Sequence, residues 1–505
     1  MSTIKRIDAG SVPVVENSLA LFDLPPSVVS YNKTYQKELL PLNFITRDGP
    51  YHFRLYSDSS FIDLSRTYIQ TTTSIEKKVN DAWVPIADTD DDMNTSVIQN
   101  YGLSFIKQLK LTLNSVEIYN STILYPYYAY IETEFFKAYD SKLGLYQAGL
   151  YYTDRMKGLS QVDSKSAGFA YRRSRFEKGQ KCVSFSRLEF DLANQPRLIL
   201  PNSDLIFSIW SSGDRFLVLA PDYKEAQQAV AVEDPWLRQA AGAAAAVAAA
   251  TAGGRTPAQI AAAAKAAADA AAPPPAASQA PQTMANGTTY RIKVEDIRIY
   301  CTLVDVVQSL QNSLAKQLEL TPAKYPIRRI EMRNQYMSEG QTNLTFNCFQ
   351  AVLPRRVLVF FINNNAFDGA LDMSPFEFQH GNVQSISIES GGVNVPSAPY
   401  LLDFSEENSN FVRAFWDFHS GIDMENIELS LSKYKNGFCG YAFDLRSFNR
   451  DLGDAFELIK NSTTVLKIHL SKPVEDPGLQ VLVWGEFDSV ITINSDRVIS
   501  LDGSI

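Results

Sequence analysis

Histidines are the side chains best suited to bind a transition metal or to transfer a proton, and this chain has four: His52, His380, His419 and His469. Zinc and cupin-type sites normally take at least two ligands from adjacent positions in the sequence. No two of these histidines have such spacing. A site assembled from distant positions is the alternative to four ordinary core or surface histidines. We therefore predict no metal and no cofactor.

The motifs that carry nucleotide or hydrolytic chemistry are also missing from the sequence. It contains neither a phosphate-binding G-x-x-x-x-G-K loop nor a dinucleotide-binding fingerprint. It contains neither a G-x-S-x-G nucleophile elbow nor an H-E-x-x-H zinc motif. The sequence therefore predicts a protein that is not an enzyme and has no catalytic residue.

Two charged clusters offer weaker signals. The acidic cluster at residues 88–92 could hold a hard cation, but it lacks the glycine and the distant glutamate of a calcium loop, so a solvated loop tip is the simpler interpretation. The basic cluster Tyr171–Lys181 could contact nucleic acid or an acidic neighbouring subunit. Because Glu177 reduces its positive field, a solvated loop is again the simpler interpretation.

Length and charge limit the possible functions. A chain of 505 residues, 45% apolar and 11% aromatic, is long enough for two or three hydrophobic cores. Its 47 basic and 56 acidic residues give a net charge of -9, which disfavours the broad positive field of a general nucleic-acid binder. We expect no direct sequence-specific binding of nucleic acid.

Cysteine spacing and the amino terminus indicate a reducing compartment. The first residues contain no apolar segment of signal-peptide length, so we expect synthesis in the cytosol. The four cysteines are far apart in the sequence, which predicts free and buried thiols: Cys182, Cys301, Cys348 and Cys439.

Most of the predicted secondary structure consists of short strands, which would have to position any functional site. Apolar or alternating runs, punctuated by Gly, Asn, Asp and Pro, predict an all-β chain of antiparallel sandwiches. The predicted strands are Tyr51–Tyr56, Thr67–Ile75, Ile106–Leu113, Val183–Leu192, Asp204–Trp210, Tyr290–Val304, Thr342–Phe349, Arg356–Ile362, Val383–Ile388, Glu428–Leu431, Val465–Leu470 and Leu479–Trp484. A few short helices complete the pattern, because apolar residues recur at helical spacing in Pro126–Asp140 and in Phe411–His419.

Features of different kinds recur at one offset along the chain. Each predicted helix follows a pair of strands and a proline, and three pairs of residues have nearly the same separation. Leu109 and Ser385 are 276 positions apart, as are Phe135 and Phe411, and Trp210 and Trp484 are 274 apart. This regularity predicts a tandem duplication of one sandwich.

The segment Leu353–Gly369 reads LPRRVLVFFINNNAFDG and contains an unbroken apolar run. Such a run fits a strand that is covered on both faces, and Val357, Val359 and Phe361 are its candidate core or subunit-wall residues. We expect Asn363–Asn365 and Phe367–Gly369 to form the turn after it, since asparagine and glycine tolerate positive φ.

An alanine-rich insertion interrupts the first half of the chain at about residues 224–288. Methyl groups bury little area, so this segment cannot form a core of its own, and glycine, proline and charge break it too often for a membrane span. It is either two short helices, at 240–250 and 257–272, or disordered. The predicted organisation is an arm (1–38), a first sandwich (39–310), a linker (311–326) and a second sandwich (327–505).

Several motifs together resemble one family of viral proteins. The run from Ala323 to Gly369, which begins AKYPIRRIEMRNQYMSEG, continues to MSPFEFQHGNV and VPSAPYLLDF. LALFDLPPS, FIDLSRTYIQ, YPYYAYIETEF and LYYTDR lie upstream. In combination these segments are similar to the major capsid proteins of Maverick/Polinton elements, adintoviruses and related small double-stranded DNA viruses.

The resemblance implies a double jelly roll, which is two tandem eight-stranded sandwiches in one chain, and a homotrimeric, pseudo-hexagonal, hexon-type capsomer. The capsomers would tile the icosahedral shell of a virion, contact their neighbours, and meet penton and minor capsid proteins. Assembly would take place in the cytoplasm or the nucleus. We expect the strand Val357–Ile362 in the second sandwich and the insertion on the outer face of the capsomer. An inner membrane is left open.

The segment before the first sandwich has few periodic signals. Leu24, Pro25 and Pro26 are therefore the candidate residues of an inter-subunit arm, with packing along the same subunit as the alternative. Another virion protein of sandwich type, such as a penton or receptor-binding protein, is the alternative to a major capsid protein. A jelly-roll enzyme or lectin would need a metal or sugar site that the histidines and acids do not supply.

Overall fold

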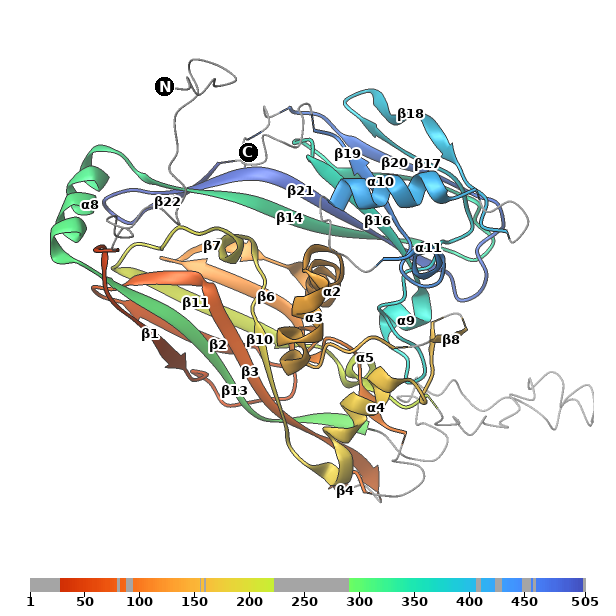
Figure 1. Cartoon of the computed structure of the whole chain (residues 1–505), viewed down its shortest axis with the longest axis horizontal. Helices are drawn as coiled ribbons and strands as arrows, with labels where there is room; N and C mark the ends of the chain where they lie inside the picture. Colours follow the sequence, from red (N-terminus) through yellow and green to blue (C-terminus); the bar gives the residue numbers. More distant parts are fainter. Residues whose placement is uncertain are drawn as a thin grey trace, which may run out of the picture.

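The chain folds into two β-sandwich lobes that lie side by side (Figure 1). The computed structural model describes residues 28–79, 82–87, 94–154, 156–158, 160–221, 290–405, 410–422, 429–446, 456 and 460–502. The first lobe runs from strand β1 to strand β13, and the second runs from β14 to β22.

The first lobe consists of two facing antiparallel sheets. The β3 sheet has the strand order β1-β13-β3-β10, with β4 also paired to β3, and the β6 sheet has the order β2-β11-β6-β7. Their strands are β1 Tyr31–Leu39, β2 Tyr51–Ser57, β3 Phe61–Val79, β4 Ala82–Pro85, β6 Ile106–Leu113, β7 Val116–Asn120, β10 Cys182–Arg187, β11 Ser203–Ser211 and β13 Tyr290–Val306. Two small ribbons pair β5 Ser96–Val97 with β12 Val218–Leu219, and β8 Met156–Gly158 with β9 Gln161–Val162.

The second lobe repeats this topology. The β16 sheet has the order β14-β21-β16-β19, with β22 also paired to β21, and the β17 sheet has the order β15-β20-β17-β18. Its strands are β14 Ala323–Met337, β15 Asn343–Phe349, β16 Arg356–Asn363, β17 Val383–Ser390, β18 Val393–Leu401, β19 Gly440–Asp444, β20 Thr464–Leu470, β21 Leu479–Ile493 and β22 Ile499–Asp502. In chain order, the eight main strands of each lobe occupy the same places in the two sheets. The fold is therefore two tandem jelly rolls of eight strands each, as the sequence predicted.

Short helices close the edges of the lobes and connect them. The α-helices are α1 Tyr101–Ser104, α2 Tyr125–Phe136, α3 Tyr139–Leu143, α4 Ala167–Ser174, α5 Asp214–Leu217, α8 Gln308–Leu320, α9 Asn364–Asp368, α10 Val412–Ile422 and α11 Leu431–Lys435. The 3-10 helices are η2 Thr122–Leu124, η3 Leu145–Gly149, η4 Glu177–Gly179 and η5 Asp191–Asn194. Helix α8 joins the lobes, and α2 lies between them (Figure 1).

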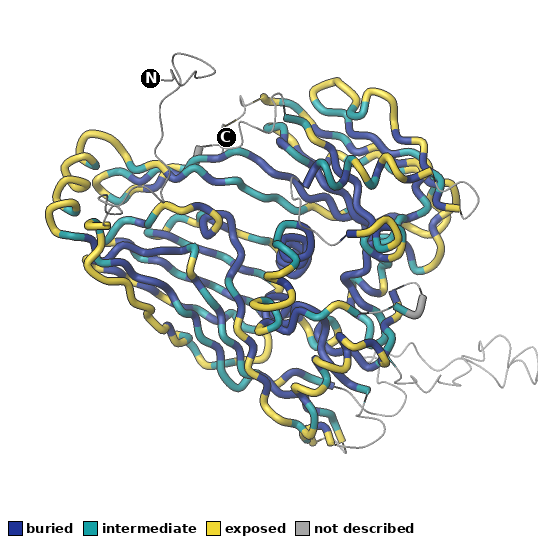
Figure 2. Tube along the Cα trace, viewed as in Figure 1, coloured by how far each residue is buried: buried dark blue, intermediate teal, exposed yellow. Residues whose placement is uncertain are grey.

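Burial follows the pattern of side chains along each strand. In β11 buried and partly buried residues alternate along the whole strand, because one face of the β6 sheet packs on the core and the other is partly wetted. In β16 six consecutive residues, from Val357 to Ile362, are buried. One hydrophobic cluster extends through both lobes, and the deeply buried part of the chain crosses the boundary between them (Figure 2). Strand β16 is therefore covered on both faces, as the apolar run Val357–Ile362 predicted.

The duplication is confirmed by topology, but two of the three residue correspondences were wrong. Phe135 lies in the last turn of α2, whereas Phe411 directly precedes α10. Leu109 lies in β6 and Ser385 in β17, which hold equivalent places. Trp210 lies in β11, whose counterpart is β20, whereas Trp484 lies in β21. The connections differ in length between the lobes, because β6 and β11 start 97 residues apart while β17 and β20 start 81 apart, and the first lobe also carries the long segment between β12 and β13. A constant offset therefore cannot persist to the last strands.

Other local predictions also need correction. The run Glu428–Leu431 is not a strand over its described part, because Ser430 caps helix α11 by accepting a hydrogen bond from the Lys433 backbone N–H. Strand β10 ends at Arg187, and η5 follows at Asp191–Asn194 in place of the predicted continuation to Leu192.

The polar segment after β16 is a short helix in place of the expected turn. Asn363 has φ -60° and caps α9 by accepting from the Asn365 backbone N–H at 2.9 Å. Gly369 ends the helix at φ +93°, a left-handed conformation that glycine adopts without strain. Only the glycine therefore uses the positive φ that was expected of the asparagines as well.

The domain boundaries differ from the predicted ones. Residues 31–39, most of which were assigned to the arm, form β1 and pair with β13 at the edge of the β3 sheet. The predicted linker 311–326 contains most of α8 and the first residues of β14. The residues before 28 and the alanine-rich insertion lie outside the described residues.

Candidate functional site: the wall between the lobes

The four histidines have separate hydrogen-bond partners. The His52 Nδ1 lies 2.9 Å from the Ser208 hydroxyl, and the His419 Nε2 lies 3.1 Å from the Leu429 carbonyl. The other two, His380 and His469, contact Asn382 and Asn343. Within the ranges that the structure describes, no group of three His, Cys, Asp or Glu side chains could hold a metal ion. All four cysteines are buried free thiols.

The basic cluster Tyr171–Lys181 contains one structural residue that the sequence did not reveal. Arg172 and Asp154 form a salt bridge at 2.6 Å with both side chains 0% exposed. The Arg172 guanidinium also donates to the Val97 carbonyl at 2.8 Å. The interpretation of this cluster as a solvated loop is therefore wrong at Arg172, which ties helix α4 to β5 and to the loop before β8. No signal in the sequence distinguished this arginine from its neighbours.

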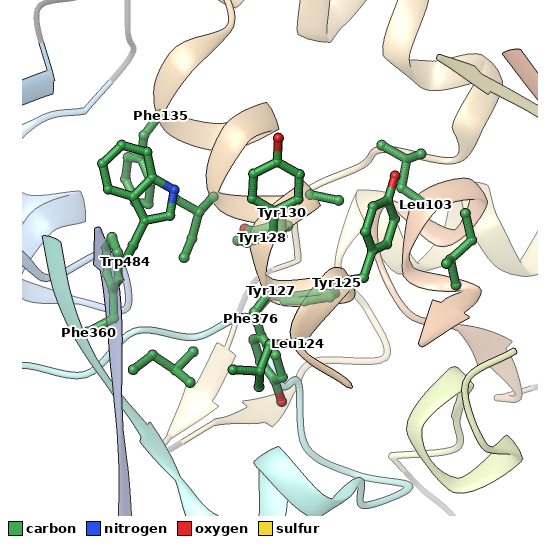
Figure 3. Packing of buried hydrophobic residues seen from close by; sticks show 14 of the residues in the cluster. Leu103, Leu124, Tyr125, Tyr127, Tyr128, Tyr130, Phe135, Phe360, Phe376 and Trp484 are labelled. Carbon is green, nitrogen blue, oxygen red and sulfur yellow. The ribbon is translucent and has the colours of Figure 1, made fainter. Parts of the chain in front are cut away.

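Helix α2 is the centre of the contact between the lobes. Residues 125–135 of this helix are all buried. A helix that is buried on all sides must be covered on all sides, and here the two lobes cover it. Its aromatic side chains meet those of the second lobe (Figure 3). Tyr130 stacks on Phe376 with ring centroids 4.3 Å apart, and Phe136 stacks on Trp484 at 5.4 Å.

Strand β16 carries this contact on one face only. Phe360 stacks on Phe135 of α2 at 5.6 Å, and the side chains at 356 and 358 share its face of the sheet. Val357, Val359 and Phe361 are 0% exposed and project to the opposite face. On that face Phe349 of β15 packs against Gly485, which pairs with Val357, so these three residues face the second lobe's own intersheet core. We call the face of Phe360 the outer face of the β16 sheet.

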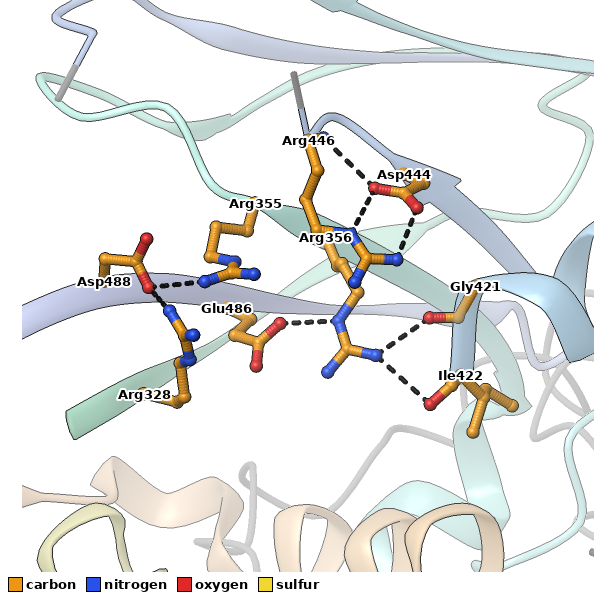
Figure 4. Close-up of polar contacts among 9 residues, drawn as sticks. All are labelled: Arg328, Arg355, Arg356, Gly421, Ile422, Asp444, Arg446, Glu486 and Asp488. Carbon is orange, nitrogen blue, oxygen red and sulfur yellow. Dashed lines mark hydrogen bonds and ion pairs between the residues drawn. The ribbon is translucent and has the colours of Figure 1, made fainter. Parts of the chain in front are cut away.

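Two arginines precede the apolar run of β16, and both lie in an ionic network (Figure 4). The Arg356 Nε donates to Glu486 at 2.5 Å, and its Nη1 donates to the Gly421 and Ile422 carbonyls at 2.9 and 3.2 Å. These carbonyls belong to the last turn of α10, where unpaired acceptors favour a cation. The Arg356 guanidinium also lies 5.4 Å from the Phe136 ring. Arg356 thus joins β16, α10 and α2.

The wall also contains a buried carboxyl group. Glu132 of α2 is 6% exposed, and desolvation raises the pKa of its carboxyl to about 7, opposed by the nearby Lys137 ammonium. Asp191 of η5 accepts a hydrogen bond from the Ile330 backbone N–H of β14 at 3.4 Å. Burial raises the pKa of Asp191 as well. These two carboxyl groups lie where the first lobe meets the β16 sheet.

A cleft of about 710 Å³ opens at the end of the lobe contact near β8 and α11. The first lobe contributes Gln99 and Asp154 to its lining, and the second contributes His380, Lys435 and Lys472 among others. The His380 ring stacks on Phe404 at 4.5 Å, and its Nδ1 accepts from the Asn382 backbone N–H at 3.0 Å. Burial, assisted by Lys435 and Lys472, lowers the pKa of His380 to about 4.

This histidine should make the folded protein sensitive to acid. Because its pKa is below the value of about 6.5 in the unfolded chain, the unfolded state binds more protons between pH 6.5 and 4. The stability that neutral His380 contributes is therefore complete above pH 6.5 and decreases as the pH falls toward 4. Urea unfolding across this range should show a smaller loss of stability for His380→Asn than for the wild type. Equal losses in both proteins would contradict the prediction.

Two exposed surfaces are the counterparts of the two surfaces that meet in the contact between the lobes. On α10, the counterpart of α2 in the second lobe, Trp416 is 72% and Val412 is 55% exposed. On the β3 sheet, the counterpart of the β16 sheet, Phe185 is 36% exposed and lies 5.3 Å from Tyr68 and 5.8 Å from Tyr300. Exposed aromatic groups of this kind mark contact surfaces. We call them the α10 face and the outer face of the β3 sheet.

Several sequence-based candidates lie outside the described residues. These are the arm residues Leu24, Pro25 and Pro26, the acidic cluster from residue 88 to residue 92, and the alanine-rich insertion. Among the helices that the structure describes, none combines the length and the apolar character needed to cross a membrane.

The two-lobed topology defines a class of fold, the double jelly roll, and solved structures of that fold resemble this chain. The cryo-EM structure of the Sputnik virophage matches with a TM-score of 0.58 at 11% identity, over 99% of this chain and 94% of that one. The PBCV-1 virus capsid matches with a TM-score of 0.54 at 8% identity, over 96% of this chain and 100% of that one. The mavirus major capsid protein matches at 0.52 and 9% identity, over 99% and 96%.

Comparison of sequences adds one relative. An uncharacterized protein of Caenorhabditis elegans is 23% identical over 467 residues, which is 90% of this chain and 94% of that protein. No family model matches the chain. At these identities the structural likeness establishes the double jelly-roll fold.

Proposed function

We propose that this chain is the major capsid protein of an icosahedral double-stranded DNA virus or virus-like element, and that three copies form a pseudo-hexagonal capsomer. Its role is structural and not enzymatic. Its partners are further copies of itself, neighbouring capsomers, and penton and minor capsid proteins, and its location is the virion. The similar solved structures come from virus capsids and a virophage. The proposed origin in the Maverick/Polinton group rests on the sequence motifs between Leu19 and Phe404.

The contact between the lobes is the main observation that supports a trimer. It joins two different surfaces, the helix α2 of one lobe and the outer sheet face of the other. A contact of this head-to-tail kind leaves one surface of each type unused, and it generates a closed ring if the rotation between units closes. Six lobes, from three chains, would close such a ring.

The unused surfaces have the composition that this ring requires. The α10 face of one copy would pack on the outer face of the β3 sheet of the next, as α2 packs on the β16 sheet within the chain. Trp416 then supplies the large aromatic anchor that is typical of interface hot spots. The sheet face supplies Phe185, Tyr68 and Tyr300.

Trp416→Asp should therefore abolish the trimer while leaving the monomer folded, because its side chain is 72% exposed in the single chain. Native mass spectrometry of the wild type should give about three times 56.3 kDa, and the variant should give a single chain. Phe44→Ala serves as a control, since Phe44 is a 94% exposed aromatic residue in the loop between β1 and β2.

Other outcomes would refute the proposal. A wild-type pentamer would indicate a penton protein. A wild-type monomer at micromolar concentration would refute the proposed trimeric capsomer. A Trp416→Asp trimer as stable as the wild type would remove the assigned contact. Electron microscopy of the purified wild type should show three-fold particles with six lobes.

A further inference from the structure

The packing of the two lobes does not explain what stabilises helix α8. It has 13 residues and no buried residue, and it contributes no side chain to either hydrophobic cluster. It projects from one end of the molecule, where the tube is almost entirely exposed (Figures 1 and 2). Helices of this length are marginal in water without tertiary packing. Beyond its two cap residues, Val307 and Thr321, the described residues give α8 few hydrogen bonds to the rest of the fold: the Val307 N–H donates to the Ser30 carbonyl and the Gln311 side chain donates to the Ser59 carbonyl.

The sequence of α8 has one apolar stripe. Leu310, Leu314 and Leu318 follow one another at intervals of four residues and therefore lie on one side of the helix. Leu310 is 38% and Leu314 is 40% exposed, and Leu318 is partly exposed. The opposite side carries Asn312 and Lys316. A helix with this pattern buries its stripe against another apolar segment.

The described chain begins beside the amino-terminal end of α8. Val28 and Val29 are 75% and 79% exposed, and the Val307 backbone N–H donates to the Ser30 carbonyl at 3.1 Å. The residues before Val28 include Leu19-Ala20-Leu21-Phe22-Asp23-Leu24, the densest apolar run of the first 27. Extended chain covers at most about 3.5 Å per residue, so the nine residues from Val28 back to Leu19 reach about 30 Å. Helix α8 is about 20 Å long, so the whole stripe is within reach.

We propose that residues 19–24 dock on the leucine stripe of α8 in the same chain, and that this contact stabilises the helix that joins the lobes. The segment offers four large apolar side chains against three leucines, and it emerges at the amino-terminal end of the helix. Leu24, a candidate residue of the inter-subunit arm, would then pack along its own subunit and stabilise the connection between the sandwiches. The contact is a property of the single chain and does not depend on the capsid function.

Hydrogen exchange on the full-length protein tests the contact directly. The amides of residues 19–24 should exchange at least about tenfold more slowly than in a peptide of the same sequence. The variant with Leu310→Asp and Leu314→Asp should lose this protection and also the protection of α8. The matched control, with Ser309→Asp and Asn312→Asp, adds the same charge on the other side of the helix and should keep both. Unprotected residues 19–24 in the wild type, or equal protection in both variants, would overturn the proposal.

A disulfide between single cysteines separates this chain from a second copy as the source of the segment. The native cysteines are at most 4% exposed, so Leu21→Cys and Leu314→Cys introduce the accessible thiols. Oxidation of the double variant should yield a cross-linked single chain with no free accessible thiol. A species of twice the chain mass would overturn the assignment to the same chain, and recovery of two free thiols would overturn the contact.

Discussion

Val359→Asp should yield no soluble folded protein. Val359 is 0% exposed and lies between Val483 of β21 and Tyr441 of β19 in the β16 sheet, facing the intersheet core of the second lobe. A buried carboxyl group without a partner costs more than about 4 kcal/mol, which is a large part of the stability of a typical domain. Expression followed by gel filtration should show aggregate or no protein, and no trimer.

Val393→Asp is the matched control for this substitution. Val393 is also a strand valine of the second lobe, at the start of the edge strand β18, but it is 63% exposed. The new carboxylate stays in water there, so the protein should fold with stability within about 0.5 kcal/mol of the wild type. Normal yield and normal trimers from Val359→Asp would place the strand outside the core and refute the register of the β16 sheet.

Phe135→Ala and Phe360→Ala should each destabilise the protein by about 3–5 kcal/mol, because each removes a buried aromatic ring from the wall between the lobes. Phe135 is 1% and Phe360 is 0% exposed, and their rings stack with centroids 5.6 Å apart. The double variant should be more stable than the sum of the two losses predicts, with a coupling of about 0.5–1.5 kcal/mol. Urea unfolding of the four proteins measures this coupling.

Phe349 provides the control pair. It is 3% exposed and packs on Phe487 inside the second lobe, 5.1 Å between centroids. Phe349→Ala should be equally destabilising, yet its effect should add to that of Phe135→Ala within about 0.5 kcal/mol, since the two rings have no recorded contact. A coupling of zero between Phe135 and Phe360 would mean that α2 does not hold the lobes together through this pair.

Much of the fold could be predicted because the strands have local signatures. Alternation in β2 and β11 and the long apolar run in β16 depend only on which faces are wet. Both helical segments between the equivalent strands, α2 and α10, were also predicted from spacing. The register and the edge strands were harder to predict from the sequence. Strand β1 has only one buried residue and β18 contains two prolines, so neither shows a clear apolar pattern.

The contact surfaces could be predicted only in part. The sequence singled out the apolar run of β16, but Val357, Val359 and Phe361 were chosen without knowing which face meets the other lobe. The roles of Arg172 and Arg356 depend on Asp154, Glu486 and the end of α10, which come close only in the folded chain. Spacing in the sequence carries no information on such partners.

The sequence by itself determined an all-β chain with a repeated sandwich, because period-two apolar patterns and turn residues are local properties. It also determined that histidine spacing supports no metal site formed by adjacent residues. Only the tertiary structure decided which strands are equivalent, since insertions shift the numbering without changing the sheet order. It also decided that α2 is covered by the second lobe while Trp416 of α10 is not, because the coverage of a surface depends on which distant segments fold against it.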